Sequence, residues 1–170
     1  PKGLGRRAEL SLRRLSLIAL VLLLLTACQD DGSSTSRSAP TATAGDDGEG
    51  NADVLRVRAL QGDDGTWTFH VTVEHPDTGW EDYADGWDVV IADGTVVKPD
   101  PDAPFTRLLL HPHVNEQPFT RSQGGIEIPS DVTQVRVRAH DLVDGYGGRE
   151  VVVDLTRSSG QDFEVVQKGD

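Results

Sequence analysis

The amino-acid sequence predicts an all-β fold, an antiparallel β-sandwich of about seven to eight short strands, within residues 53–156. In several stretches apolar residues alternate with polar ones, which is the pattern of a strand with one buried face. Turn-forming Gly, Pro and Asp separate these stretches at a spacing of about ten residues, as in all-β sandwiches. No stretch shows the apolar repeat of an amphipathic helix.

The first predicted strands alternate most regularly. Residues 54–60 place three apolar side chains on one face: Leu55, Val57 and Ala59. Residues 66–75 place four on one face: Trp67, Phe69, Val71 and Val73. Residues 86–94 align a third set before the turn at Asp93-Gly94: Trp87, Val89 and Ile91. Trp67 or Trp87 is therefore a candidate core tryptophan.

The later strands are shorter and are separated by turns. Residues 95–98 form one, and the proline-rich segment 99–104 ends it. Residues 105–111 and 124–129 are two further apolar runs, and 149–155 closes the domain. Residues 132–141 place three apolar side chains on one face: Val135, Val137 and Ala139. Residues 157–170 are polar, and we expect them to be a flexible tail.

The N-terminal residues 1–27 have the organisation of a signal peptide. A basic segment precedes the apolar run 15–27, whose length is that of a signal-peptide apolar region and too short for a membrane span. The run ends in Leu25-Thr26-Ala27-Cys28, which resembles the lipobox of bacterial lipoproteins. The resemblance implies cleavage before Cys28, a covalent lipid on its thiol, and further acylation, as by palmitate. The alternative is an ordinary secretory signal with an incidental cysteine.

A lipid anchor implies an extracytoplasmic protein of the cell envelope. In bacteria with two membranes it would sit on the outer membrane or the periplasmic face, and Gln29 after the cysteine favours the outer membrane. In bacteria with one membrane it would sit on the outer face of the plasma membrane. Residues 28–52 contain no Val, Leu, Ile or aromatic residue, so we expect a disordered acidic linker. Cys28 is the single cysteine, so the domain has no disulfide and no thiol nucleophile.

The net charge of the chain indicates which classes of partner it can bind. The net charge of −12 disfavours nucleic acid, because phosphate binding needs clustered Lys and Arg. It suits a soluble monomer, or a basic or envelope-protein partner.

Residues 128–155 resemble the last two strands of fibronectin type III and immunoglobulin-like domains. A proline-led turn enters a Val-x-Val-x-Ala strand, and a glycine-bearing loop leads to the final strand. Thr133 stands where those domains have a tyrosine. The resemblance implies an immunoglobulin-like sandwich, a fold that hosts many functions and carries no activity by itself.

The segment LLLHPHVNEQ contains the main candidate site. On an extended strand His111 and His113 would share a face, with Glu116 close behind. Imidazole pairs with a carboxylate suit Zn²⁺ or Cu²⁺, and His75 and His140 are possible further ligands. The alternative is an ordered loop shaped by prolines, with the histidines in hydrogen bonds.

No catalytic constellation is recognisable, so we expect a protein without enzymatic activity. Acidic turns such as those at Asp77 and Glu81-Asp82 could bind Ca²⁺, but Asp is also a common turn residue. Two hypotheses result. The first is a lipid-anchored sandwich that acts as a non-catalytic binding or envelope-interaction module. The second is an extracytoplasmic Zn²⁺ or Cu²⁺ binding protein that uses the His-Pro-His motif.

Overall fold

The computed structural model describes residues 50–169. This part of the chain is all-β, with ten strands in two sheets, which confirms the predicted fold class. The proposed signal peptide, Cys28 and most of the proposed linker lie outside the described residues. Within residues 50–169 no helix has the length and hydropathy of a membrane span.

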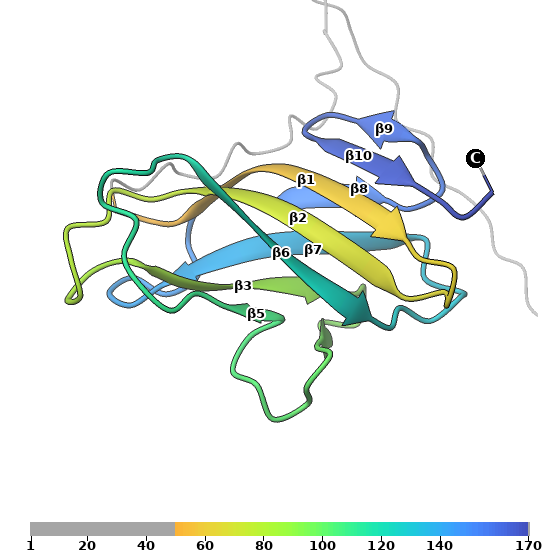
Figure 1. The fold of residues 1–170 in the computed structure, drawn as a ribbon, viewed down its shortest axis with the longest axis horizontal. Helices are drawn as coiled ribbons and strands as arrows, with labels where there is room; N and C mark the ends of the chain where they lie inside the picture. The colour runs from red at the N-terminus through yellow and green to blue at the C-terminus, as the bar shows by residue number, and fades with distance from the viewer. Residues whose placement is uncertain (1–49, 170) are drawn as a thin grey trace, which may run out of the picture. The chain divides into compact units, whose positions relative to one another are not determined.

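The first sheet has the strand order β6-β2-β1-β10-β9. Its strands are β6 (Phe119–Ile126), β2 (Trp67–Glu74), β1 (Asp53–Gln61), β10 (Phe163–Val166) and β9 (Ser159–Gly160). The second sheet has the order β4-β3-β7-β8, with β5 also paired to β3. Its strands are β4 (Val96–Val97), β3 (Ala84–Val90), β7 (Gln134–Asp141), β8 (Val151–Asp154) and β5 (Arg107–Leu108). Strands β1, β2 and β6 pass in front of β3 and β7 in Figure 1.

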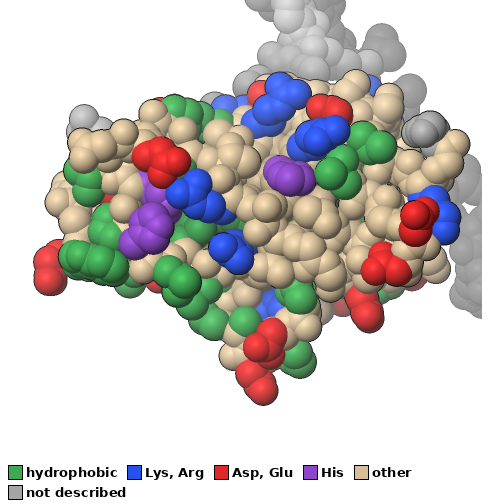
Figure 2. Space-filling model, in the orientation of Figure 1, with side chains coloured by type: hydrophobic (Ala, Val, Ile, Leu, Met, Phe, Trp, Pro, Cys, Tyr) green, Lys and Arg blue, Asp and Glu red, His purple; other side chains and the backbone are tan. Residues whose placement is uncertain are grey.

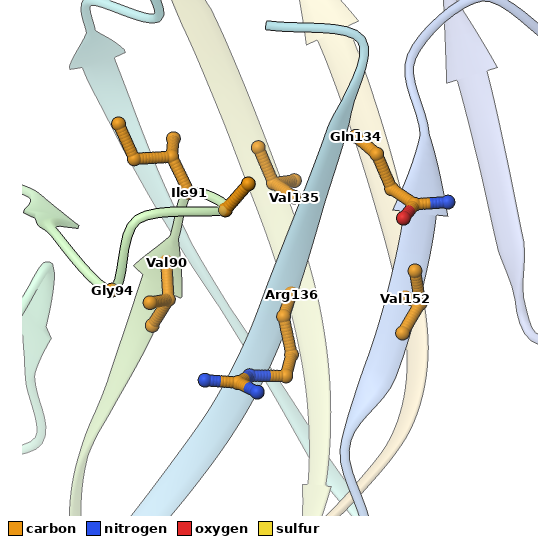
Figure 3. A pocket seen from close by; sticks show the side chains of 8 residues that line it. Val90, Ile91, Gly94, Gln134, Val135, Arg136 and Val152 are labelled. Atoms are coloured by element: carbon orange, nitrogen blue, oxygen red, sulfur yellow. The ribbon is translucent and has the colours of Figure 1, made fainter. Parts of the chain in front are cut away.

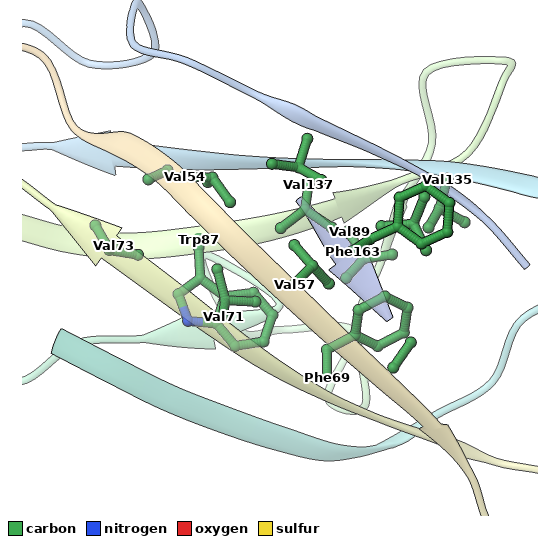
Figure 4. Close-up of a cluster of buried hydrophobic side chains, with 14 of the residues drawn as sticks. Val54, Val57, Phe69, Val71, Val73, Trp87, Val89, Val135, Val137 and Phe163 are labelled. Atoms are coloured by element: carbon green, nitrogen blue, oxygen red, sulfur yellow. The ribbon is translucent and has the colours of Figure 1, made fainter. Parts of the chain in front are cut away.

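The hydrophobic core lies between the sheets. In β2 the predicted inward face is confirmed, because every second residue from Trp67 to Val73 is buried. In β7 the inward residues Val135, Val137 and Ala139 are also buried, as predicted. Trp87 of β3 is fully buried, and Figure 4 shows it in one cluster of buried side chains with Val71 of β2. In β2 and β7 the alternating pattern therefore identified the core, because each of these two strands packs only one face inward.

Strand β1 departs from strict alternation. Its register against β2 shifts between Val54 and Arg56, so that one extra residue is inserted in β1. As a result Val54 is fully buried and Leu55 only half-buried. The prediction that Leu55 shares the buried face is wrong, because a β-bulge restarts the alternation at that point.

Two segments of the middle region differ from expectation. Strand β6 begins at Phe119, well before the predicted strand at 124–129. Its register against β2 shifts near Trp67. In β6 only Phe119 and Ile126 are buried, so its sequence shows no regular alternation of apolar and polar residues. Residues 105–111 contribute only the two-residue strand β5, because pairing with β3 is limited to two residue pairs.

The predicted flexible tail at 157–170 is wrong. Residues 159–160 and 163–166 form β9 and β10, and β10 pairs in parallel with β1. Phe163 and Val165 are buried, with the half-buried Glu164 between them. Without β10, strand β1 would leave a row of unpaired backbone groups at the sheet edge, and the added strand satisfies them. The domain therefore extends through residue 166.

The segment before β8 lies directly against the start of β1. Val54 N donates to Arg149 O at 2.8 Å, and a side chain at Gly148 would place its Cβ 2.2 Å from Ala52 O. Ala52 is buried, although the predicted linker extends to this residue. The predicted linker therefore ends before Ala52. The reason is packing, because a small side chain beside a glycine can be buried without belonging to a strand.

Candidate functional site

Three connections meet at one end of the sandwich, on the left in Figure 1. They are the segments 75–83, 109–118 and 142–150, which join β2 to β3, β5 to β6 and β7 to β8. Backbone hydrogen bonds hold them together: Leu142 N donates to Tyr83 O at 3.2 Å, and Leu109 N donates to Asp85 O at 2.8 Å. Loops held on a rigid scaffold are where functional residues concentrate.

A buried carboxylate, that of Asp77, organises this end of the fold. Its Oδ1 lies 2.6 Å from His75 Nδ1 and accepts the backbone N–H of Ala84 at 3.1 Å. Its Oδ2 accepts the backbone N–H of His113 at 2.6 Å. His75 N in turn donates to Gln117 Oε1 at 3.1 Å. One carboxylate thus connects two loops and the first residue of β3.

Beside Asp77, three ligand-type side chains converge. One nitrogen or carboxylate oxygen from each of His75, Asp82 and Asp141 lies within 4.8 Å of the other two. His75 Nε2 and Asp82 Oδ1 are 3.7 Å apart. His75 and Asp141 are 1% and 0% exposed, and Asp82 is partly open to solvent. Among the described residues, His75 Nε2, Asp82 Oδ1 and Asp141 Oδ2 have no hydrogen-bond partner.

The structure does not bring His111, His113 and Glu116 to one point. Strand β5 ends at Leu108, so the expected same-face arrangement of the two histidines does not arise. Their rings lie 4.6 Å apart, but His111 is exposed, whereas His113 is buried and stacks on Phe119. Glu116 instead pairs with a neighbouring guanidinium, that of Arg121, at 3.1 Å.

The environment of His113 disfavours its charged form. Burial lowers the pKa of its imidazole below the ordinary value, and the charges of Arg121 and His111 lower that pKa further. At neutral pH the ring is therefore neutral. Within residues 50–169, neither ring nitrogen has a hydrogen-bond partner.

The other two candidate ligands, His75 and His140, belong to different clusters. His140 lies on β7 with its Nδ1 2.6 Å from Asp85 Oδ1. Next to it, Tyr146 donates its hydroxyl to Asp88, and the guanidinium of Arg138 lies over the tyrosine ring. Burial raises the pKa of Tyr146 above its ordinary value, and the bond to Asp88 raises it further.

No sequence motif groups His75, Asp82 and Asp141, although the sequence carries one signal for two of them. His75 continues the buried phase of β2 after Val73, and Asp141 continues that of β7 after Ala139. A titratable residue in the inward phase of a strand is a candidate for a buried polar site. Asp82 carries no such signal, because it lies in a turn.

Next to this cluster lies an open groove, lined by Gly79, Trp80 and residues 111–116. Large apolar side chains near it are exposed, including Trp80 at 66%, Leu110 at 69% and Val114 at 50%. Figure 2 shows histidine and hydrophobic side chains gathered at this end of the molecule. A separate hollow between the β3–β4 turn and strands β7 and β8 has an aliphatic lining with Gln134 and Arg136, and no acidic or histidine side chain lines it (Figure 3).

Comparison with known proteins found a partial relative. Over 86 residues, which are 51% of this chain, the sequence is 45% identical to a protein of Halomicrobium mukohataei named "Putative lipoprotein". The matched segment spans 38% of that protein's length. No protein-family model and no solved structure matches the chain.

Proposed function

We propose that the protein is an extracytoplasmic lipoprotein, anchored in the cell envelope through lipid on Cys28, whose β-sandwich is a non-catalytic binding module. The motif Leu25-Thr26-Ala27-Cys28 after an apolar run carries this proposal. The name of the partial relative agrees with it. One acyl chain alone binds membranes only marginally, so the proposal includes both the lipid on the thiol and acylation of the new N-terminus, palmitate being the expected acid.

The binding surface of this proposal is the loop end of the sandwich. Trp80, Leu110, Val114 and Val143 are half or more exposed there. Apolar side chains clustered in solvent mark interaction sites more often than isolated ones do. Because the chain carries a net charge of −12, a basic surface on an envelope protein is the complementary partner.

We further propose that the sandwich is immunoglobulin-like. Strands β1, β2 and β6 oppose β4, β3, β7 and β8, and the chain crosses between the sheets after β2, before β6 and after β6. The hairpin of β7 and β8 is the segment whose sequence resembles that family. Strands β9 and β10 are then an addition at the β1 edge.

The anchor is tested by comparing Cys28→Ala with Ser33→Ala, a control in the same segment. Cells are labelled with an alkyne-bearing fatty acid, and membranes are separated from soluble material. We expect the wild type and Ser33→Ala to carry label and to sediment with membranes, and Cys28→Ala to lose both properties. Membrane association of an unlabelled Cys28→Ala protein would show that the lipid proposal is wrong.

The binding surface is tested by a photo-cross-linking amino acid at position 80, with the same amino acid at position 152 as the control. Val152 is also half-exposed, but it lies on β8, away from the loop end. We expect a distinct cross-linked protein from position 80 and not from position 152. The same bands from both positions, or none from position 80, would contradict a binding role for the loop end.

A further inference from the structure

We infer that His75, Asp82 and Asp141 form a binding site for a divalent transition-metal cation, with Zn²⁺ as the first probe. One imidazole nitrogen and two carboxylate oxygens compose the donor set. Imidazole suits Zn²⁺ and related metals, and carboxylates accompany it in many Zn²⁺ sites. Ca²⁺ is disfavoured, because it takes six to eight ligands, all of them oxygen atoms.

The spacing of the donor atoms suits one ion. Zn²⁺ binds nitrogen and oxygen at about 2.0–2.2 Å, so donors in a tetrahedral shell lie about 3.4 Å apart. His75 Nε2 and Asp82 Oδ1 are 3.7 Å apart, and all three donor atoms lie within 4.8 Å of one another. A decrease of at most about 1.4 Å in any donor–donor distance, by side-chain rotation, would bring the three donors to the separations of a tetrahedral shell.

The donor atoms have no hydrogen-bond partner among the described residues. His75 Nε2, Asp82 Oδ1 and Asp141 Oδ2 are each buried at the atomic level, and each lacks such a bond. A buried polar atom left without a partner costs about 1–3 kcal/mol, and more when the group is charged. Two carboxylates in one buried cluster also repel each other. A divalent cation would remove both costs, because it neutralises the carboxylates and coordinates all three atoms.

The surrounding contacts orient the ligands as a metal site requires. Asp77 Oδ1 lies 2.6 Å from His75 Nδ1, and a carboxylate there accepts the Nδ1 proton. Nε2, which lies 3.7 Å from Asp82 Oδ1, is then the unprotonated nitrogen that can bind a metal. Carboxylate–histidine–metal chains of this kind fix the tautomer and raise the basicity of the ligand. Asp141 is held likewise, because its Oδ1 accepts the backbone N–H of Val143 at 3.0 Å and that of Asp144 at 2.6 Å.

Access to the site comes from the turn that carries Asp82. Thr78 N donates to Asp82 O at 3.0 Å, and Asp82 N donates to Gly79 O at 3.3 Å, so the turn is closed by its own backbone. The side chain of Asp82 is 33% exposed, whereas His75 and Asp141 are fully enclosed. The side chain of the third ligand therefore reaches the surface although its Oδ1 is buried, so a cation can enter beside it and a water molecule can take the remaining position.

The test is calorimetric titration of the full chain in detergent, after removal of metal with EDTA, with Zn²⁺, Mn²⁺ and Ca²⁺ in separate runs. The decisive variant is Asp82→Asn, because Asp82 Oδ1 has no hydrogen-bond partner within the described chain and the substitution should leave the fold intact. Glu81→Gln, an exposed neighbour, is the matched control. Asp141→Asn is a second ligand variant, and Cys28→Ala should bind as the wild type does, since the site does not depend on the anchor.

We expect one Zn²⁺ per chain, a higher Tm with Zn²⁺, and affinity at least tenfold weaker in Asp82→Asn but unchanged in Glu81→Gln. Absence of heat and of a Tm shift with Zn²⁺ and Mn²⁺ would overturn the inference. Zn²⁺ binding that survives Asp82→Asn and Asp141→Asn, or that is lost in His111→Ala, would place the ion elsewhere and overturn it too. Binding of Ca²⁺ alone would refute the transition-metal assignment.

Discussion

The most direct test of the buried network is the substitution Asp77→Asn. The side chain keeps its shape, but one of its two oxygen acceptors becomes an NH₂ donor. In the native protein Oδ1 accepts the N–H of Ala84 at 3.1 Å, and Oδ2 accepts that of His113 at 2.6 Å. Whichever way the amide is oriented, one of these backbone donors faces another donor and loses its partner.

The expected magnitude follows from that loss. An orphaned buried N–H costs about 1–3 kcal/mol, and the bond lost is one to a charged acceptor, so the free energy of unfolding should fall by about 2–4 kcal/mol. Asp77→Ala removes all three hydrogen bonds and should cost about 3–5 kcal/mol, since two buried backbone N–H groups lose their acceptor at once. The measurement is urea unfolding followed by circular dichroism, with EDTA present so that bound metal does not contribute.

The control is Asp93→Asn, in an exposed turn. Asp93 Oδ1 accepts the N–H of Thr95 at 2.8 Å, and an asparagine oxygen can accept the same bond. We expect a change within about 0.5 kcal/mol. If Asp77→Asn were no more destabilising than Asp93→Asn, the view that Asp77 holds the loop end together would be refuted.

Three further predictions concern packing and titration. Gly148→Ala should destabilise the domain by about 1–3 kcal/mol, because its Cβ would meet Ala52 O at 2.2 Å. The control is Gly124→Ala, whose Cβ would meet only a side chain. Equal melting temperatures of the two variants would contradict the predicted clash. The lowered pKa of His113 means that, as pH falls below 6.5, the unfolded chain takes up a proton that the folded chain does not. The free energy of unfolding should therefore decrease from pH 7 to 5, and His113→Gln should reduce this slope; an unchanged slope would exclude the histidine as its source. Tyr146→Phe should remove the tyrosine that ionises late in an alkaline absorbance titration, since the raised pKa belongs to that residue; if the late phase persists in the variant, the assignment is wrong.

The strands with one buried face could be predicted from the sequence. In β2 and β7 every second residue is apolar, and the structure buries those residues. The pattern succeeds because side chains of a strand alternate between its two faces, and only one face of these strands meets the core. It is less informative for β3, where all seven residues from Ala84 to Val90 are buried.

The failures occurred where pairing with another strand decides the outcome. Leu55 turned away from the core because β1 carries a bulge against β2. Residues 163–166 form a strand because the edge of β1 is open to them. Neither the bulge in β1 nor the strand β10 can be predicted from local alternation alone, since both depend on a paired strand that is distant in the sequence.

The sequence by itself determined the strand-rich core and the lipobox resemblance of Leu25 to Cys28, because each is a property of consecutive residues. It also placed His75 and Asp141 in the buried phase of their strands, without showing that they meet. Only the tertiary structure brought them together, since β2 and β7 belong to opposite sheets. A turn then adds Asp82, whereas Glu116 pairs with Arg121. A site assembled from both sheets depends on how the sheets pack against each other. The distance between side chains on opposite sheets is not encoded by residues that are neighbours in the chain.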